Sequence, residues 1–196
     1  MAHKNVLEYY DAIAQFWDME YADMEVARSV AAAVSVPRSG GYALDIGCGS
    51  GSMILDLLQY GACEIEGVDI SGAMVEMAQE KFYFDPRISF TQADFMDLDR
   101  PGYDLAIAFN SYHHFLCPKA FIEKAHSLLR CSGRLTVAYG FSRKQTNQLS
   151  EVLPHGIARL LRPAAEEAAV WSSHFDVDIL CDTSEMYLIS GRALEL

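Results

Sequence analysis

The nine residues Ala43-Leu44-Asp45-Ile46-Gly47-Cys48-Gly49-Ser50-Gly51 decide the fold of this chain. Apolar residues lead into three glycines, and apolar residues at helical spacing follow from residue 52. This is how a parallel β-sheet presents a nucleotide-like ligand to bare backbone. A second apolar stretch ends eighteen residues after the last glycine, at Asp69. It predicts the neighbouring strand and a second carboxylate near the ligand.

The carboxylate of Asp45 discriminates between ligands. In a dinucleotide site the turn lies against a pyrophosphate, whose negative charge is stabilised by the N-terminus of the helix that follows. Asp45 stands two positions before the first glycine and would repel those phosphates. S-adenosylmethionine has no phosphate, and the part of it that lies across such a turn carries an ammonium and a sulfonium. The sequence therefore favours S-adenosylmethionine over NAD.

Residues 45–51 resemble motif I of the class I S-adenosylmethionine-dependent methyltransferases. Four further segments resemble later motifs of that family, and they follow one another along the chain in the order that the family has. These segments are residues 69–74, 93–95, 103–110 and 128–135. The resemblance covers most of the chain and implies a methyltransferase of the small-molecule type. It also implies an α/β fold: a three-layer α/β/α sandwich with a seven-stranded, mostly parallel sheet of order 3-2-1-4-5-7-6, in which strand 7 is antiparallel.

The hydrophobic pattern alternates predicted strands and helices. Strands are predicted at residues 42–46, 64–69, 88–92, 103–109 and 134–139. Helices are predicted at residues 6–17, 24–36, 52–60, 72–82, 118–130, 146–161 and 164–172. Two last strands, 175–180 and 186–190, are separated by only five residues, which suits a hairpin rather than a helical crossover. This order predicts a parallel sheet with helices on both faces and an antiparallel end.

Composition indicates the class of protein. The 196 residues are expected to form one methyltransferase domain, 1–196, that buries roughly 70% of its unfolded surface. A formal charge of −12 would repel a phosphate backbone, so nucleic acid is not an expected substrate. Neither a secretion signal nor a membrane span is visible, so no membrane partner is expected. The five cysteines lack metal-ligand spacing, which predicts reduced thiols, a cytoplasmic location and no metal.

The glycine turn is the predicted centre of the cofactor site. Gly47, Gly49 and Gly51 let the backbone approach the methionine portion closely, and Cys48 between them belongs to the same predicted site. Asp45 is expected to interact with the amino group of the cofactor, directly or through water. The alternative interpretation is a generic tight turn.

Residues after the second predicted strand should hold the rest of the cofactor. Asp69 can accept hydrogen bonds from both ribose hydroxyls, as acidic residues do in other doubly wound sites. Its alternative role, an N-cap for the next helix, fits Ser71 better. Ile70 and Met74 are predicted as apolar walls for the adenine ring, or else as core residues.

The third predicted strand is followed by a group of carboxylates. The resemblance implies that Asp94 accepts a hydrogen bond from the adenine amino group while the backbone of Phe95 reads the ring edge. Asp97 and Asp99 lie nearby in the sequence and leave the choice of carboxylate open.

Residues 10–18 resemble the Tyr-Asp-x-x-Ala-x-x-Tyr-Asp segment of many small-molecule members of the family. There the segment folds as a lid, so the resemblance implies an amino-terminal helical lid over residues 1–36, with Tyr10 and Trp17 contacting the cofactor. Trp17 stands where the pattern has its second tyrosine. The alternative is that Phe16 and Trp17 merely bury a helix against the sheet.

The candidate catalytic residues follow the fourth predicted strand. Residues 110–115 leave its carboxyl end, where an open α/β sheet places its ligand. A base is needed only when the acceptor must lose a proton, and histidine titrates near neutrality. His113 is the preferred base and His114 the second candidate, while Asn110 is assigned to the cofactor site. Either histidine could instead bridge backbone groups at the start of a helix.

The predicted reaction moves a methyl group from S-adenosylmethionine to oxygen, nitrogen, sulfur or carbon of a small-molecule acceptor. The protein would act as a monomer or homodimer. Two other classes stay open: a non-catalytic subunit that binds S-adenosylmethionine and stabilises a partner, and an NAD-dependent oxidoreductase. No motif identifies the acceptor.

Overall fold

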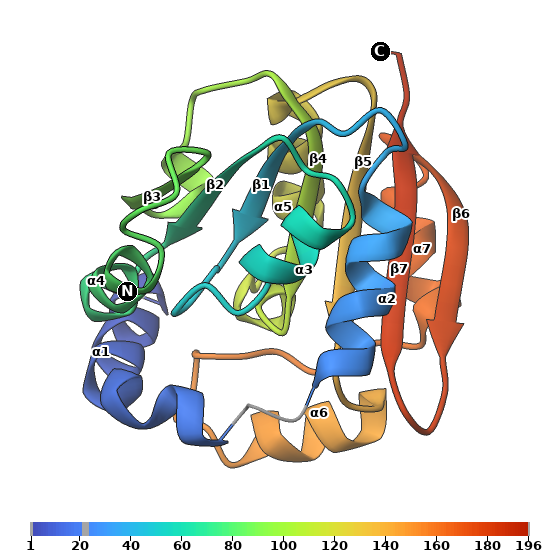
Figure 1. The fold of residues 1–196 in the computed structure, drawn as a ribbon. Helices are drawn as coiled ribbons and strands as arrows, with labels where there is room; N and C mark the ends of the chain where they lie inside the picture. The colour runs from blue at the N-terminus through green and yellow to red at the C-terminus, as the bar shows by residue number, and fades with distance from the viewer. Residues whose placement is uncertain (1, 21–23, 196) are drawn as a thin grey trace.

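The computed structural model describes residues 2–20 and 24–195, and strands from this part of the chain form a seven-stranded sheet (Figure 1). The strands are β1 (Tyr42–Ile46), β2 (Glu64–Asp69), β3 (Ile88–Gln92), β4 (Tyr103–Phe109), β5 (Leu129–Tyr139), β6 (Phe175–Asp182) and β7 (Tyr187–Ala193). Their order is β3-β2-β1-β4-β5-β7-β6. β7 is antiparallel to both of its neighbours, and the other pairs are parallel. The predicted fold class and strand order are confirmed.

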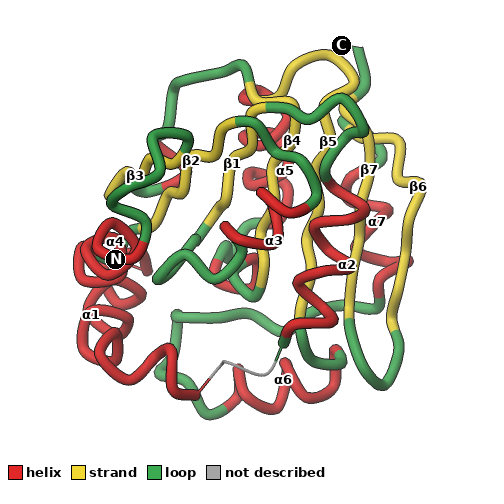
Figure 2. Tube along the Cα trace, in the orientation of Figure 1, coloured by secondary structure: helices red, strands yellow, loops and turns green. Residues whose placement is uncertain are grey.

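Helices connect these strands and cover the sheet, as Figure 2 shows. They are α1 (Ala2–Glu20), α2 (Glu25–Ser35), α3 (Ile54–Gln59), α4 (Gly72–Lys81), α5 (Pro118–Leu128), α6 (Arg143–Glu151) and α7 (Ala164–Trp171), with 3₁₀ turns η1 (Phe95–Asp97) and η2 (Tyr112–His114). Local signals set several of the ends. Ser71 caps α4 by accepting a hydrogen bond from the Met74 N–H, as predicted, and Pro118 occupies the first turn of α5.

The core lies on both faces of the sheet. Along β4, Leu105 and Ile107 face the cluster that contains α2 and α3, while Ala106 and Ala108 face the cluster that contains α5 and α7. This alternation follows from the two-residue period of a strand, and burial on both faces is typical of parallel sheets. A rigid sheet results, and the loops after its parallel strands meet at one edge.

Several segments gather beyond that edge. In Figure 1, α1 and α6 lie past the carboxyl ends of the parallel strands. Among the residues that the structure describes, no helix combines the length and apolar character needed to cross a membrane.

The helix predicted at residues 146–161 is wrong in its second half. α6 begins at Arg143 and ends at Glu151, and residues 152–163 form an irregular segment. Pro154 and Gly156, which has a φ of 85°, interrupt the helical pattern. The irregular segment returns along the edge of the sheet where the strand loops meet.

β5, α1 and α3 also differ from the predicted bounds, and other elements, such as β6 and β7, differ by one to three residues at an end. β5 begins five residues earlier than expected, because Leu129 already pairs with Tyr103 of β4 and the residues before Arg134 bulge out of register. α1 is longer than the predicted 6–17, and α3 is shorter than the predicted 52–60. None of these differences moves the carboxyl ends of the parallel strands β1 to β5.

Candidate functional site

A cavity of about 260 Å³ lies at the carboxyl ends of the parallel strands. Its wall is formed by the turn after β1, the end of β2, the residues after β3 and β4, and side chains from α1 and α2. The predicted site residues on the wall are Tyr10, Gly47, Cys48, Gly49, Asp69, Ile70, Met74, Asp94, Phe95, Asn110 and His114. Asp45, Gly51 and His113 lie behind the wall, and the side chain of Trp17 is outside the described residues.

The glycine turn holds bare backbone against the cavity. Gly47 and Gly49 have φ values of 68° and 53°, a region that favours glycine. The N–H of Gly47 donates to the Val68 carbonyl at 2.8 Å, which ties the turn to β2. A Cβ on Gly47 would lie 2.6 Å from the Cβ of Ser111. Gly51 instead packs against the ring of Phe82, so it closes the turn rather than lining the cavity.

Asp45 lies beneath this turn and is almost completely buried. Its Oδ2 atom has no hydrogen-bond partner among the described residues. Burial, with a smaller contribution from the charge of Asp69, raises the pKa of Asp45 to about 8. A buried carboxylate oxygen without a partner is costly, so this atom is a place where a ligand cation or a water would be stabilised.

Asp69 joins the glycine turn to the start of α4. Its Oδ2 accepts a hydrogen bond from the Gly49 N–H at 2.8 Å, and its Oδ1 accepts one from the Ser71 N–H at 2.9 Å. Burial raises the pKa of Asp69, and these backbone N–H groups oppose the rise. Each oxygen has further acceptor capacity toward the cavity, which suits two neighbouring hydroxyls.

The far end of the cavity is an apolar slot. Ile70 and Met74 form one side, and Phe95 packs edge-on against Phe115 with ring centroids 5.5 Å apart. Asp94 sits at the slot as the N-cap of η1, where it accepts the Met96 N–H at 2.9 Å. A flat, mostly apolar ring with a polar edge would fit between these side chains.

Asn110 fixes the end of β4. It adopts a φ of 55°, a left-handed conformation that is uncommon for a residue other than glycine. Its Oδ1 accepts the Gly140 N–H at 3.1 Å, and its Nδ2 donates to Met24 Sδ at 3.1 Å. Asn110 therefore links β4, β5 and the entry to α2 at the cavity wall.

The two histidines have different positions. His114 lines the cavity and makes two hydrogen bonds: Nδ1–H donates to the Ile157 carbonyl at 2.9 Å, and Nε2 lies 2.7 Å from the Tyr10 hydroxyl. Because the carbonyl can only accept, Nε2 is the acceptor from Tyr10. Burial lowers the pKa of His114 to about 4, so the ring is neutral near pH 7.

His113 is held inside the protein. Its backbone N–H donates to the Tyr139 hydroxyl at 2.7 Å, and its Nδ1 lies 3.0 Å from the same oxygen. Burial, then the nearby His114 and Arg159, lower the pKa of His113 well below its usual range. The side chain faces Tyr139 and the ring of His114 rather than the cavity, so it supports the loop.

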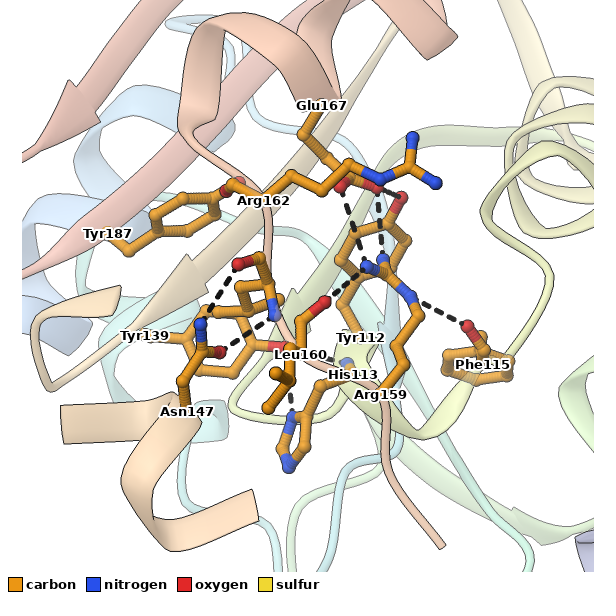
Figure 3. A network of polar contacts seen from close by, with 11 residues as sticks. Tyr112, His113, Phe115, Tyr139, Asn147, Arg159, Leu160, Arg162, Glu167 and Tyr187 are labelled. Atoms are coloured by element: carbon orange, nitrogen blue, oxygen red, sulfur yellow. Dashed lines mark hydrogen bonds and ion pairs between the residues drawn. The ribbon is translucent and has the colours of Figure 1, made fainter. Parts of the chain in front are cut away.

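Residues 157–162, here called the strap, pack against residues 110–115, here called the histidine loop, and hold that loop in place (Figure 3). The Arg159 N–H donates to the His113 carbonyl at 2.9 Å, and the Arg159 Nε donates to the Phe115 carbonyl at 3.1 Å. Asn147 of α6 brackets the backbone of Leu161 with bonds of 2.7 and 3.0 Å. The strap thereby orients the carbonyl that receives His114 Nδ1–H.

A buried ion pair anchors the strap. Arg159 Nη2 lies 3.0 Å from Glu167 Oε1, and Glu167 is completely buried. The same oxygen accepts a 2.7 Å hydrogen bond from the Tyr112 hydroxyl, and the guanidinium stacks over the Tyr112 ring. Sequence reasoning missed this network because residues 152–161 were predicted to be helical. Pro154, Gly156 and Pro163 were the available signals.

Two more residues near the cavity were not predicted. Asp11 Oδ1 accepts a 2.5 Å hydrogen bond from the Ser71 hydroxyl and a longer one, 3.4 Å, from the Ala73 N–H at the start of α4. Arg28 of α2 lines the cavity wall. Asp11 is the first aspartate of the 10–18 segment but was not assigned a role, and Arg28 belongs to no local motif; helix packing brings Arg28 to the cavity and Asp11 to the start of α4.

Residues 43–133 match the family model described as "Methyltransferase domain". A curated relative, 27-O-demethylrifamycin SV methyltransferase of Amycolatopsis mediterranei (strain S699), is 33% identical over 131 residues, which are 62% of this chain and 48% of that protein. The chain spans about half or less of the length of the first curated relatives that it matches.

Two solved structures share the fold over nearly the whole chain. One is the complex of the Haloferax volcanii Trm112 methyltransferase activator with its putative methyltransferase, with a TM-score of 0.81, 20% identity, and coverage of 97% of this chain and 98% of that chain. The other is magnesium protoporphyrin IX methyltransferase from Synechocystis PCC 6803 with bound S-adenosylhomocysteine, with a TM-score of 0.73, 22% identity, and coverage of 98% and 100%.

Proposed function

We propose that this chain, whose residues 43–133 match the methyltransferase domain model and whose fold is that of S-adenosylmethionine-dependent methyltransferases, transfers the methyl group of S-adenosylmethionine to a small-molecule acceptor. One observation carries the proposal: the glycine turn and Asp69 line the same cavity as Tyr10 and His114, and the unpartnered Asp45 oxygen lies behind that turn. Groups suited to the cofactor and groups suited to an acceptor therefore share one enclosed site.

The residues on the wall fit the cofactor. Gly47 and Gly49 present backbone without side chains at the cavity wall, and the unpartnered Asp45 oxygen suits an ammonium. Asp69 suits the ribose hydroxyls, and the slot between Met74 and Phe95 suits the adenine ring. When bound, S-adenosylmethionine supplies a methyl group on a positively charged sulfur, which is already activated toward an in-line displacement.

Tyr10 and His114 form the proton-accepting pair. The Tyr10 O–H donates to Nε2 of neutral His114, and a phenol oxygen that donates its proton in this way can itself accept a hydrogen bond from the O–H or N–H of the methyl acceptor. As the acceptor attacks, its proton passes to the Tyr10 oxygen and the Tyr10 proton passes to Nε2. The Ile157 carbonyl stabilises the resulting imidazolium through Nδ1–H. We therefore assign the base role to His114, acting through Tyr10, rather than to His113.

The remaining parts of the chain enclose this chemistry. The amino-terminal segment, 1–36, is the lid of a domain that spans residues 1–196. Through α1 it reaches His114 with Tyr10 and α4 with Asp11, on two sides of the cavity. Exclusion of water and positioning supply much of the rate of a displacement that starts from an activated carbon. The limited cavity volume and the charge of −12 support a small acceptor rather than a nucleic acid.

The test is an acceptor screen with the purified chain and S-adenosylmethionine, in which S-adenosylhomocysteine is quantified and products are identified by mass spectrometry. With an acceptor that loses a proton, Tyr10→Phe should lower kcat by about a hundredfold while the Kd for S-adenosylhomocysteine changes less than about threefold. His114→Ala should lower kcat in the same way, and His155→Ala, at an exposed position, is its matched control and should leave kcat unchanged.

The other outcomes identify the alternatives. Binding of S-adenosylhomocysteine without turnover of any acceptor would favour a non-catalytic cofactor-binding subunit. A thermal shift with NAD and none with S-adenosylhomocysteine would favour an oxidoreductase, because a ligand that binds only the native state raises its Tm.

A further inference from the structure

Arg28 of α2 carries a permanent positive charge at the cavity wall. The other ionisable side chains on that wall, within the described part of the chain, are Tyr10, Asp69, Asp94 and His114, together with the thiol of Cys48. Two of these are carboxylates, and His114 is neutral near pH 7. Arg28 is thus where an anionic group of a ligand would be stabilised.

An ion pair orients the guanidinium and leaves part of it available. Arg28 Nε donates to Asp56 Oδ2 of α3 at 3.1 Å, with both side chains largely shielded from solvent. The two terminal nitrogens make no hydrogen bond or ion pair with the described residues. A guanidinium presents five N–H donors in a planar fork that matches a carboxylate. The vacant donors therefore favour a carboxylate as the ligand group.

The position of Arg28 indicates which carboxylate it meets. Asp56 anchors the side chain to α3, which follows the glycine turn, and Ser52 between that turn and α3 also lines the cavity. The slot of Ile70 and Met74 is built by β2 and α4 instead. Arg28 belongs to the part of the cavity next to the glycine turn, where the amino-acid portion of the cofactor fits.

We propose that Arg28 binds the α-carboxylate of the methionine moiety of the cofactor. This inference rests on the cofactor part of the proposed function. It completes the polar contacts proposed for the cofactor: Asp45 suits the ammonium, Asp69 suits the ribose hydroxyls, and Arg28 provides the positive charge for the carboxylate. The Arg28–Asp56 pair also ties α2, part of the lid, to the methionine portion of the ligand.

Two ligands test the inference on the unmodified chain by titration calorimetry. One is S-adenosylhomocysteine, and the other is its decarboxylated analogue, which keeps the ammonium, sulfur, ribose and adenine. We expect the analogue to bind about ten- to a hundredfold more weakly, because a charge-assisted bond is lost. Equal affinity for the two ligands overturns the inference. Failure of both ligands to bind overturns the cofactor assignment itself, which distinguishes the two failures.

Variants locate the effect at Arg28. Arg28→Met should lose about ten- to a hundredfold in affinity for S-adenosylhomocysteine and change less than threefold for the decarboxylated analogue. Arg38→Met, at an exposed position beyond α2, should change neither affinity. Asp56→Asn, which leaves the guanidinium present but less well oriented, should lose a smaller factor. If Arg28→Met and Asp56→Asn both retain full affinity for S-adenosylhomocysteine, the carboxylate is bound elsewhere and the inference is wrong.

Discussion

The two halves of the cavity are built in different ways. The cofactor half consists of the ends of β1, β2 and β3 with the glycine turn, and its polar groups lie within a few residues of a strand end. The half that we assign to the acceptor is lined by the end of β4 and the histidine loop 110–115, and the strap packs against that loop from outside the cavity wall. Its partners come from segments far apart in the sequence, such as Tyr10 with His114 and His114 with Ile157.

The halves also differ in how their buried polar groups are satisfied. In the cofactor half, Asp45 keeps an oxygen without a partner in the described chain. In the acceptor half, Glu167 is paired with both Tyr112 and Arg159 although it is completely buried. The Asp45 oxygen is therefore available to a ligand, whereas the Glu167 carboxylate is fully used in contacts that make the acceptor half rigid. Substitutions should therefore affect ligand affinity in one half and stability in the other.

The largest effect is expected at the strap. Arg159→Leu leaves the buried Glu167 carboxylate without its cation, so the free energy of unfolding should fall by about 3 to 5 kcal/mol in urea denaturation. The Kd for S-adenosylhomocysteine should stay within about threefold below the transition. Arg143→Leu removes a more exposed ion pair, with Asp182, and should cost less than about 1 kcal/mol.

A double variant checks the reason for this loss. Arg159→Leu with Glu167→Leu removes both charges and should recover part of the stability lost in the single variant. If the single variant is as stable as the unmodified chain, the strap is not anchored by this pair.

A second prediction addresses the cofactor half. Asp69→Ala removes the expected ribose contacts and also the acceptor for the Gly49 and Ser71 N–H groups. The affinity for S-adenosylhomocysteine should therefore fall by about a hundredfold in titration calorimetry. Asp99→Ala, an exposed carboxylate after β3, is the control and should bind normally. A loss below threefold for Asp69→Ala would contradict the proposed role of this residue.

The contrast explains how much could be predicted from the sequence. The ends of β1, β2, β3 and β4 were predicted to the residue, because apolar runs and glycines act locally. The cap of α4 by Ser71 was predicted for the same reason. Asp45 and Gly47 were identified within one strand-turn-helix unit and Asp69 at the end of the next strand, and their proximity follows from the topology of a parallel sheet.

The acceptor half could not be predicted in the same way. The sequence shows two adjacent histidines but not which one faces the cavity, because that depends on Ile157 and Tyr10, which are remote in the chain. The strap has no regular structure, and no local pattern indicates its pairing with Glu167. Arg28 reaches the cavity and Asp11 the start of α4 through helix packing, which periodicity does not specify.

A third prediction uses the pH dependence of stability. The pKa of Asp45 is raised by burial to about 8 in the folded chain, against an ordinary value near 3.9. Its contribution to stability is therefore fully present below about pH 4 and is lost as the pH rises toward 8. Asp45→Asn removes this loss, so the variant should be more stable than the unmodified chain by at least about 2 kcal/mol at pH 8 and similar at pH 4.

The same variant separates stability from function. Asp45→Asn should weaken the binding of S-adenosylhomocysteine while it raises the Tm at pH 8, since the unpartnered carboxylate is kept for the ligand rather than for the fold. Asp97→Asn, at an exposed position, should change neither quantity. A variant that loses stability at pH 8 would show that the Asp45 carboxylate has a partner in solution.

The smallest effect is expected where the lid meets the cofactor half. Asp11 accepts hydrogen bonds from Ser71 and, at longer distance, from the Ala73 N–H, and it places a negative charge at the N-terminus of α4. Such an exposed interaction contributes about 0.3 to 1 kcal/mol. Asp11→Ala should therefore raise the dissociation rate of S-adenosylhomocysteine by about two- to fivefold in stopped-flow measurements, with a smaller change in the association rate. Glu76→Ala, an exposed acidic residue on α4, should leave both rates unchanged. If dissociation is as slow in Asp11→Ala as in the unmodified chain, α1 does not retain the cofactor through this contact, and the lid would act through Tyr10 and the acceptor half alone.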